Sequence, residues 1–149
     1  MAVRFDTTGA SGAAIVIDGL DAVYDACDAV GPELRRRLDR DVGEAVARVA
    51  RAAAARVDSR TGRTAAGYRV SRRRGVWRVV NRELGATILE FAQTPRCRRG
   101  ETLIRTLDAK YGPPGRILWH SWERLGPSVA EDVQRIIRDA EMRIESAGV

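Results

Sequence analysis

Two long segments of the chain repeat an apolar residue every three or four positions, which is the spacing of one face of an α-helix. The first spans about six turns and carries Leu34, Leu38, Val42, Val46, Val49, Ala53 and Val57. The second carries Leu118, Trp122, Leu125, Val129, Val133, Ile136, Ala140 and Ile144. Gly126-Pro127 interrupts the second pattern, so we expect a kink there or a short helix followed by a longer one. Both segments therefore predict long helices with a single apolar face.

Shorter patterns predict the smaller elements. A first helix carries Leu20, Val23, Tyr24 and Cys27 on one face, and Gly31-Pro32 ends it. Tyr68 and Val70 alternate with polar residues before the β-rich run from Val76 to Val80, and Arg73-Arg74-Gly75 lies between the two. This alternation predicts a β-hairpin. A short helix is expected from Leu84 to Phe91.

The remaining segments show no sustained pattern. Residues 1–17 are polar and rich in glycine, apart from the apolar stretch Ala13 to Ile17, and we interpret them as a flexible N-terminal arm. From Gln93 to Gly115, prolines and glycines recur, so we expect a long loop at 93–115 with one or two helical turns at most. Residues 18–149 then form a single domain. Its predicted class is α+β, with two long amphipathic helices packed on a small antiparallel β-hairpin or sheet.

Composition changes this picture only slightly. The 149 residues carry a net charge of +6, yet Lys110 is the only lysine and every other basic residue is arginine. Together with the abundance of alanine, glycine and valine, this indicates a GC-rich coding sequence, which raises the arginine content without a functional cause. The charge alone is therefore weak evidence for nucleic-acid binding. No apolar run approaches the ~18 residues that span a bilayer, and no signal peptide opens the chain, so we expect no membrane association.

The residues that usually carry chemistry are sparse. Cys27 and Cys97 lie far apart without metal-type spacing, and His120 is the only histidine. Glu90 lies within an apolar helix, where we expect it to pair with an arginine or to cap backbone groups at the hairpin. The sequence has no phosphate-binding glycine loop and no cluster of metal ligands. We therefore expect neither enzymatic activity nor a cofactor, and a small hydrolase using Cys97 or His120 is the weakest alternative.

Short motifs also occur in a definite order along the chain. They are Gly19-Leu20 before a helix, the alanine-rich helix from Val42 to Val57, Thr61-Gly62 before a strand, the strand from Val76 to Asn81 with its amide-bearing end, Ala86 to Phe91 with Glu-Phe, and the final helix from Ile117 to Ile144. In order and spacing they resemble the tail-completion, or head–tail joining, family of long-tailed phages, including members like minor tail protein Z. The resemblance covers about residues 18 to 146.

The chain departs from the family pattern at two motifs. Ser59-Arg60 stands where proline commonly precedes Thr-Gly, and Ala92 stands where glycine usually follows Glu-Phe. The loop at 93–115 is also longer than usual. These departures leave the exact position in the neck open, since a tail-terminator ring that caps the tail tube has a similar layout.

The resemblance implies a structural protein of the virion. Such a protein is made in the host cytoplasm and assembles at the head–tail junction as a ring, with a hexamer favoured. Its neighbours would be other neck proteins and tail-tube proteins, with packaged DNA close by. An arginine-rich nucleic-acid-binding module is the alternative from another functional class.

Arginines and tryptophans are the candidates for contact with other subunits or partners. They are Arg72, Arg73, Arg74, Trp77, Arg96, Arg98, Arg99 and Trp119. The arginines fit three interpretations: a solvated surface enriched by codon usage, contact with an acidic neighbouring subunit through bidentate pairs, or contact with DNA phosphates. No recognition helix for duplex DNA is distinguishable. Trp119 lies one position off the apolar stripe, which makes it a candidate inter-subunit anchor, whereas Trp122 on the stripe is expected in the core.

Overall fold

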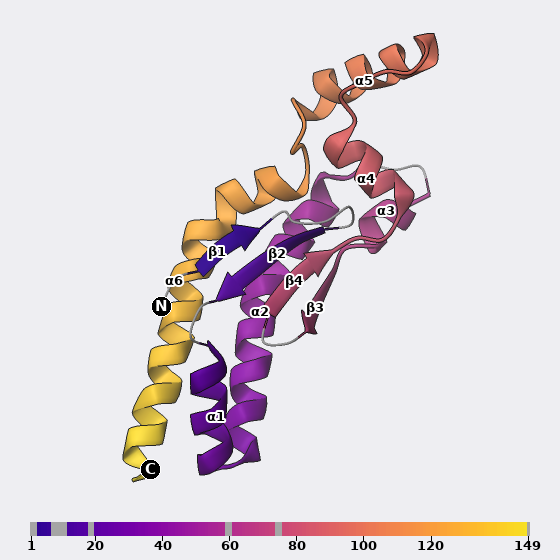
Figure 1. The fold of residues 1–149 in the computed structure, drawn as a ribbon. Helices are drawn as coiled ribbons and strands as arrows, with labels where there is room; N and C mark the ends of the chain where they lie inside the picture. Colours follow the sequence, from indigo (N-terminus) through magenta and orange to yellow (C-terminus); the bar gives the residue numbers. More distant parts are fainter. Residues whose placement is uncertain (1–2, 7–11, 18–19, 59–60, 74–75, 149) are drawn as a thin grey trace.

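The computed structural model describes residues 3–6, 12–17, 20–58, 61–73 and 76–148 (Figure 1). Their elements follow in the order β1 (Val3–Asp6), β2 (Gly12–Ile17), α1 (Leu20–Val30), α2 (Pro32–Arg56), α3 (Arg63–Ala66), β3 (Arg69–Arg73), β4 (Val76–Val80), α4 (Leu84–Phe91), α5 (Arg98–Tyr111) and α6 (Leu118–Ser146). The predicted α+β class is confirmed, with long helices packed on a small antiparallel sheet.

The sheet has four strands in the order β1-β2-β4-β3, and each neighbouring pair is antiparallel. The predicted hairpin is β3 and β4, in which Arg72 lies opposite Trp77. On its other side, Trp77 lies opposite Ile15 of β2. The prediction of a flexible arm at 1–17 is therefore wrong for 3–6 and 12–17. A hairpin alone leaves one edge of β4 unpaired, and β2 supplies the missing hydrogen bonds along that edge.

The two long helices lie side by side along the molecule, and α2 also packs on β3 and β4 (Figure 1). Their facing residues form the core: Val42, Val46 and Val49 of α2 and Val129 and Val133 of α6 have no solvent-exposed surface. Helix α1 packs against both α2 and α6. Each long helix thus buries the single apolar face that its spacing predicts.

Helix α6 is continuous from Leu118 to Ser146, with Pro127 inside it, so the expected division into two helices does not occur. Pro127 is exposed to solvent. Because proline has no backbone N–H, the carbonyl of Glu123, four residues earlier, loses its helical partner. Glu123 is also exposed, so water can reach this carbonyl, which lowers the cost of the interruption. No helix in the described part of the chain combines the length and the apolar character needed to cross a bilayer.

The predicted loop at 93–115 is wrong over most of its length, because residues Arg98–Tyr111 form the 14-residue helix α5. Figure 1 shows α5 extending beyond α4, away from the sheet and the two long helices. The glycine and proline that suggested a loop, Pro95 and Gly100, fall just before the helix and in its first turn, where both are tolerated. Of the residues of α5, all of which the structure describes, Leu107 alone is buried.

Candidate assembly interface

Helix α4 carries large apolar side chains on the side that faces solvent. Leu84, Ile88 and Phe91 recur at helical spacing, and their exposed fractions are 75%, 38% and 44%. The opposite side of the helix buries Ala86 and Glu90. We call Leu84, Ile88 and Phe91 the α4 apolar face. Three large apolar side chains aligned on so short a helix form a contiguous patch, and such patches mark interaction sites.

The start of α5 carries concentrated positive charge. Arg96, Arg98 and Arg99 are exposed, and we call them the cationic tip. Cys97, at the N-cap position, makes no side-chain capping hydrogen bond. The positive end of the helix dipole therefore adds to the three guanidinium charges, and Glu101 is the single acidic side chain in the first turn of α5. Within the described part of the chain, no ion pair engages these arginines, so the tip is available to an anionic partner.

A fully buried arginine connects the projecting helices to the body. The Arg116 side chain has no exposed surface. Its guanidinium donates to the carbonyl oxygens of Leu89 (3.1 Å), Ala92 (2.8 Å) and Gly112 (2.8 Å), and it forms an ion pair with Asp108 at 2.5 Å. These acceptors belong to the end of α4 and the end of α5. Arg116, just before α6, thus joins three helices at one point.

Glu90 makes a second connection at the same place. Its buried carboxylate accepts hydrogen bonds from the backbone N–H groups of Ile117 (3.0 Å), Leu118 (2.9 Å) and Trp119 (3.1 Å). These are otherwise unpaired donors at the start of α6, so Glu90 caps that helix from α4. The prediction that Glu90 caps backbone groups is confirmed, but the groups belong to α6 and not to the hairpin.

Asn81 fixes the other end of α4. This buried amide follows β4, donates to the carbonyl oxygen of Thr64 (2.7 Å) and accepts from the N–H of Glu83 (3.0 Å). Burial, followed by the charge of Glu90, raises the pKa of the neighbouring Tyr68 phenol. Asn81 and Glu90 therefore hold α4 at both ends, with its apolar face directed outward.

A third contact connects α5 to the end of α2. Lys110 pairs with the Asp58 carboxylate at 2.6 Å, and the Tyr111 hydroxyl accepts from the Asp58 N–H at 3.2 Å. The hydrogen bond from Lys110 holds the pKa of Asp58 below its ordinary value and raises the pKa of Lys110. Both partners are solvent-exposed, so we expect this ion pair to orient α5 more than to stabilise the fold.

Two of the predicted interface residues, Arg72 and Trp77, make contacts within the chain, and their role as partner contacts stays a prediction. Arg72 pairs with Asp39 at 2.5 Å, and its guanidinium carbon lies 3.9 Å from the centre of the Tyr24 ring. The Trp77 side chain is only 7% exposed. Tyr24 donates to Asp39 at 2.7 Å, and burial together with that hydrogen bond raises the pKa of Tyr24. Helix α2 packs on β3 and β4, and Tyr24 of α1 lies against Arg72, whose side chain stays 24% exposed.

The other predicted interface residues differ in position. Arg73 belongs to β3, opposite Val76, and its side chain lies outside the described residues, as does all of Arg74. Trp119 is 39% exposed at the start of α6, and its indole N–H donates to Glu123 at 2.7 Å. The structure thus places the cationic tip and Trp119 at the surface and brings neither together with Arg72.

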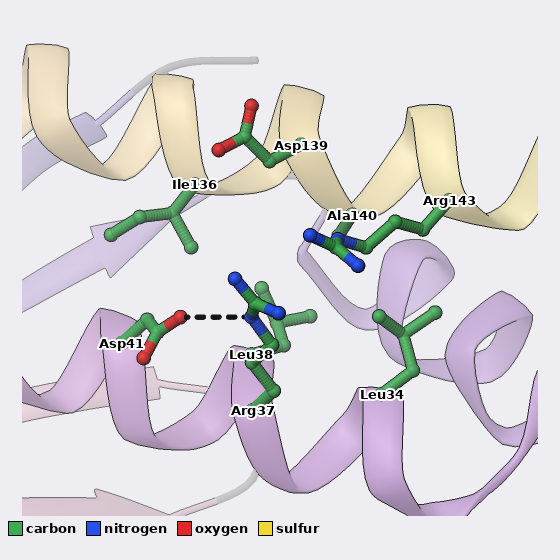
Figure 2. A pocket seen from close by; sticks show the side chains of 8 residues that line it. All are labelled: Leu34, Arg37, Leu38, Asp41, Ile136, Asp139, Ala140 and Arg143. Atoms are coloured by element: carbon green, nitrogen blue, oxygen red, sulfur yellow. Dashed lines mark ion pairs between the residues drawn. The ribbon is translucent and has the colours of Figure 1, made fainter.

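A shallow groove between α2 and α6 is lined by Leu34, Arg37, Leu38, Asp41, Ile136, Asp139, Ala140 and Arg143 (Figure 2). Its volume of about 40 Å³ is far below the several hundred Å³ of a ligand pocket. Arg37 and Arg143 extend over the groove from opposite helices, and Arg37 pairs with Asp41 at 3.7 Å. This groove is the seam between the two long helices, and it offers no site for a small molecule.

The residues considered for chemistry are scattered. Cys27 is buried, and burial raises the pKa of its thiol, whereas Cys97 and His120 are exposed. Ser121, beside the histidine, is buried and donates to the carbonyl oxygen of Ile117 at 2.7 Å. In the described part of the chain, no three His, Cys, Asp or Glu side chains are grouped so as to hold a metal ion.

Comparisons of the chain with models of protein families, with curated proteins and with solved structures found no match.

Proposed function

We propose that this chain is a structural protein of the head–tail junction of a long-tailed phage, where copies assemble into a ring. The identification with this class of protein depends on the order of motifs in the sequence. Two of these motifs have specific positions in the fold. Asn81 and Glu90 both anchor α4, whose outer side carries exposed apolar residues.

The α4 apolar face is the observation that supports assembly. Full burial of a large apolar side chain stabilises by about 1.5–3 kcal/mol, and these three side chains are already partly covered. Covering them would contribute on the order of 3 kcal/mol. Association costs at least about 4 kcal/mol in translational and rotational freedom. Two copies would therefore associate weakly through this face alone, whereas closure of a ring on a neck platform gives each copy two interfaces.

The ion pair of Arg72 with Asp39 reduces the case for a nucleic-acid-binding module. The hairpin arginines were the main element of that alternative, and Arg72 is committed to Asp39 and Tyr24. The cationic tip is an exposed basic surface that this alternative would use. A tail-terminator ring stays within the proposal, because it would use the same exposed surfaces at a neighbouring position in the tail.

Removal and replacement of the gene in the phage tests the proposal. Without the chain, we expect filled heads and complete tails that do not join, and the wild-type chain supplied in trans should restore joining. A Leu84→Ser/Ile88→Ser variant should fold but fail to restore it. Ala55→Ser, at an exposed site on α2, is the matched control and should restore joining fully.

Two results would overturn the proposal. One is normal joining of heads and tails in the absence of the chain. The other is absence of the chain from purified virions, where particle averaging should otherwise place it in a ring at the neck. Tight DNA binding that weakens steeply with salt, together with absence from virions, would instead favour the nucleic-acid-binding module.

A further inference from the structure

Helix α5 projects from the body, and one side of it is basic along its length. Figure 1 shows that α5 begins at the outermost point of the projection and returns toward α6. Arg98, Thr102 and Arg105 are spaced by four and three residues, so they align along one side of the helix. Arg99 and Thr106 border them on one flank, and all five residues are exposed. We call these five residues the α5 polar side.

The apolar residues of α5 lie on the opposite side of the helix. Leu107 is buried there, and Ile104 and Tyr111 are half-buried. Gly100 belongs to the same side and lies against the segment that precedes α5, since a Cβ on Gly100 would be 3.5 Å from Pro95. These contacts turn the α5 polar side away from the rest of the molecule.

The charge of the α5 polar side is not neutralised within the chain. In the described part of the chain, no ion pair engages its three arginines. Of the two carboxylates of α5, Glu101 borders the other flank of the α5 polar side, and Asp108 pairs with the buried Arg116. The surface is therefore positive and has one acidic neighbour, and an anionic partner would match it.

The shape of α5 suits the major groove of duplex DNA. A helix with its side chains is about 10–12 Å wide, and the major groove is about 12 Å wide. The side chain between the arginines is small, and the hydroxyl of Thr102 stays close to the helix because it donates to the carbonyl oxygen of Arg98 at 3.3 Å. Arg98 and Arg105 lie about 10 Å apart along the helix axis. They can therefore contact the duplex at two separate points of one groove.

We propose that α5 binds duplex DNA, with the α5 polar side in the major groove and its arginines on phosphate oxygens and guanine edges. A membrane surface fits α5 less well, because interfacial helices insert large apolar side chains, and those of α5 lie on the opposite side. An acidic protein would match the charge, but it would not require a projecting helix with small side chains between the arginines. This inference goes beyond the proposed function and does not depend on the phage role.

Binding of the full chain to a fluorescent duplex of about 20 base pairs tests the contact, with anisotropy measured between about 50 and 200 mM salt. We expect Arg98→Gln/Arg105→Gln to weaken binding at least about tenfold and to reduce the slope of log K against log salt by about 2. The matched control is Arg138→Gln/Arg143→Gln, which makes the same change of net charge at exposed sites of α6 far from α5 (Figure 1). It should weaken binding by less than about threefold.

Two further measurements address the sign of the charge effect and the groove. Glu101→Gln removes the bordering carboxylate and should tighten binding about threefold. Guanine N7 lies in the major groove, so the bound chain should protect it from methylation by dimethyl sulfate. Circular dichroism and thermal melting would check that each variant is folded.

The DNA contact would be refuted if the wild-type chain did not bind the duplex at about 50 mM salt, or if the two double variants lost equal affinity. Binding to polyglutamate that is as tight as binding to the duplex would instead favour an acidic protein partner and reject the DNA contact. Binding that leaves guanine N7 unprotected would reject the placement in the major groove.

The DNA contact and the phage role can fail separately. Each result against the DNA contact leaves the phage role intact, because that role is tested by joining and by presence in virions. Conversely, the expected loss of affinity in Arg98→Gln/Arg105→Gln for a chain that is absent from virions would support the DNA contact and reject the phage role.

Discussion

Replacement of Arg116 by methionine is the sharpest test of how α4, α5 and α6 are connected. Methionine retains much of the length and apolar character of arginine but removes all the donors. The variant removes the hydrogen bonds that the guanidinium donates to the carbonyl oxygens of Leu89, Ala92 and Gly112. It also leaves Asp108 without its partner.

The expected cost follows from burial. Hydrogen bonds to a charged group contribute about 1.5–3 kcal/mol each, and their contributions are not additive. Breaking a buried charged network by removing one member costs about 3–5 kcal/mol. Because Asp108 is itself half exposed, with 47% of its side chain accessible, water can solvate it after the substitution. We therefore expect a loss of about 3 kcal/mol, toward the lower end of that range.

Equilibrium unfolding in urea measures this loss as a lower midpoint with an unchanged slope. Arg105→Met is the matched control, since Arg105 is exposed on α5 and its replacement should change the stability by no more than about 0.5 kcal/mol. Hydrogen exchange should also show faster exchange of the α5 amides in Arg116→Met. A loss below about 1 kcal/mol, no larger than that of the control, would refute the interpretation of Arg116 as the main connection.

Three further predictions concern single groups. Tyr24→Phe should remove a phenol that titrates above the ordinary pKa of 10 in an ultraviolet titration. Because folding raises the pKa of Tyr24, the phenol contributes to stability below about pH 10, and this contribution is lost as pH rises through the folded pKa. An alkaline stability profile that is the same in Tyr24→Phe and wild type would contradict this. Gly126→Ala should lower the melting temperature, because the added Cβ would lie 2.8 Å from Trp122 Cε2. Overpacking of this kind costs about 1–3 kcal/mol, whereas the gain in helix propensity from alanine is about 1 kcal/mol. A higher melting temperature would contradict this prediction. Asp58→Asn should speed hydrogen exchange at the end of α5 at neutral pH, and this difference from wild type should disappear as pH falls through the lowered pKa of Asp58, where its pair with Lys110 is lost in both proteins.

The long helices could be predicted from the sequence because each buries a single apolar face. Their pattern is repeated over many turns, so a few exceptions do not obscure it. The sheet was only half predictable. Ala13 to Ile17 is apolar, but a strand that pairs with β4 across about sixty residues of chain leaves little local signal. Tertiary pairing, and not the local pattern, defines β1 and β2.

The candidate site shows the same division between local and distant causes. Alternation along the hairpin places Trp77 and Val79 on one side, but it does not show that helices cover that side. The role of Arg116 could not be predicted, because two of its acceptors lie 27 and 24 residues earlier in the chain. Glu90 was detectable as a charge within an apolar helix, which indicates a buried polar contact without naming the partner.

The way α5 is attached has a consequence for assembly. Little apolar contact connects it to the body, since Leu107 is its one buried side chain and Tyr111, its last residue, packs against the core. Polar contacts at Arg116 and at the Asp58–Lys110 pair hold the same end. Directional hydrogen bonds specify an orientation more sharply than apolar contact does. A variant that loses Arg116 would therefore keep an intact cationic tip but present it at a variable angle. We expect the Arg116→Met chain, supplied in trans, to join fewer heads and tails than the wild-type chain even under conditions where the variant is fully folded. An unchanged level of joining would show that the tip functions independently of its connection to the body.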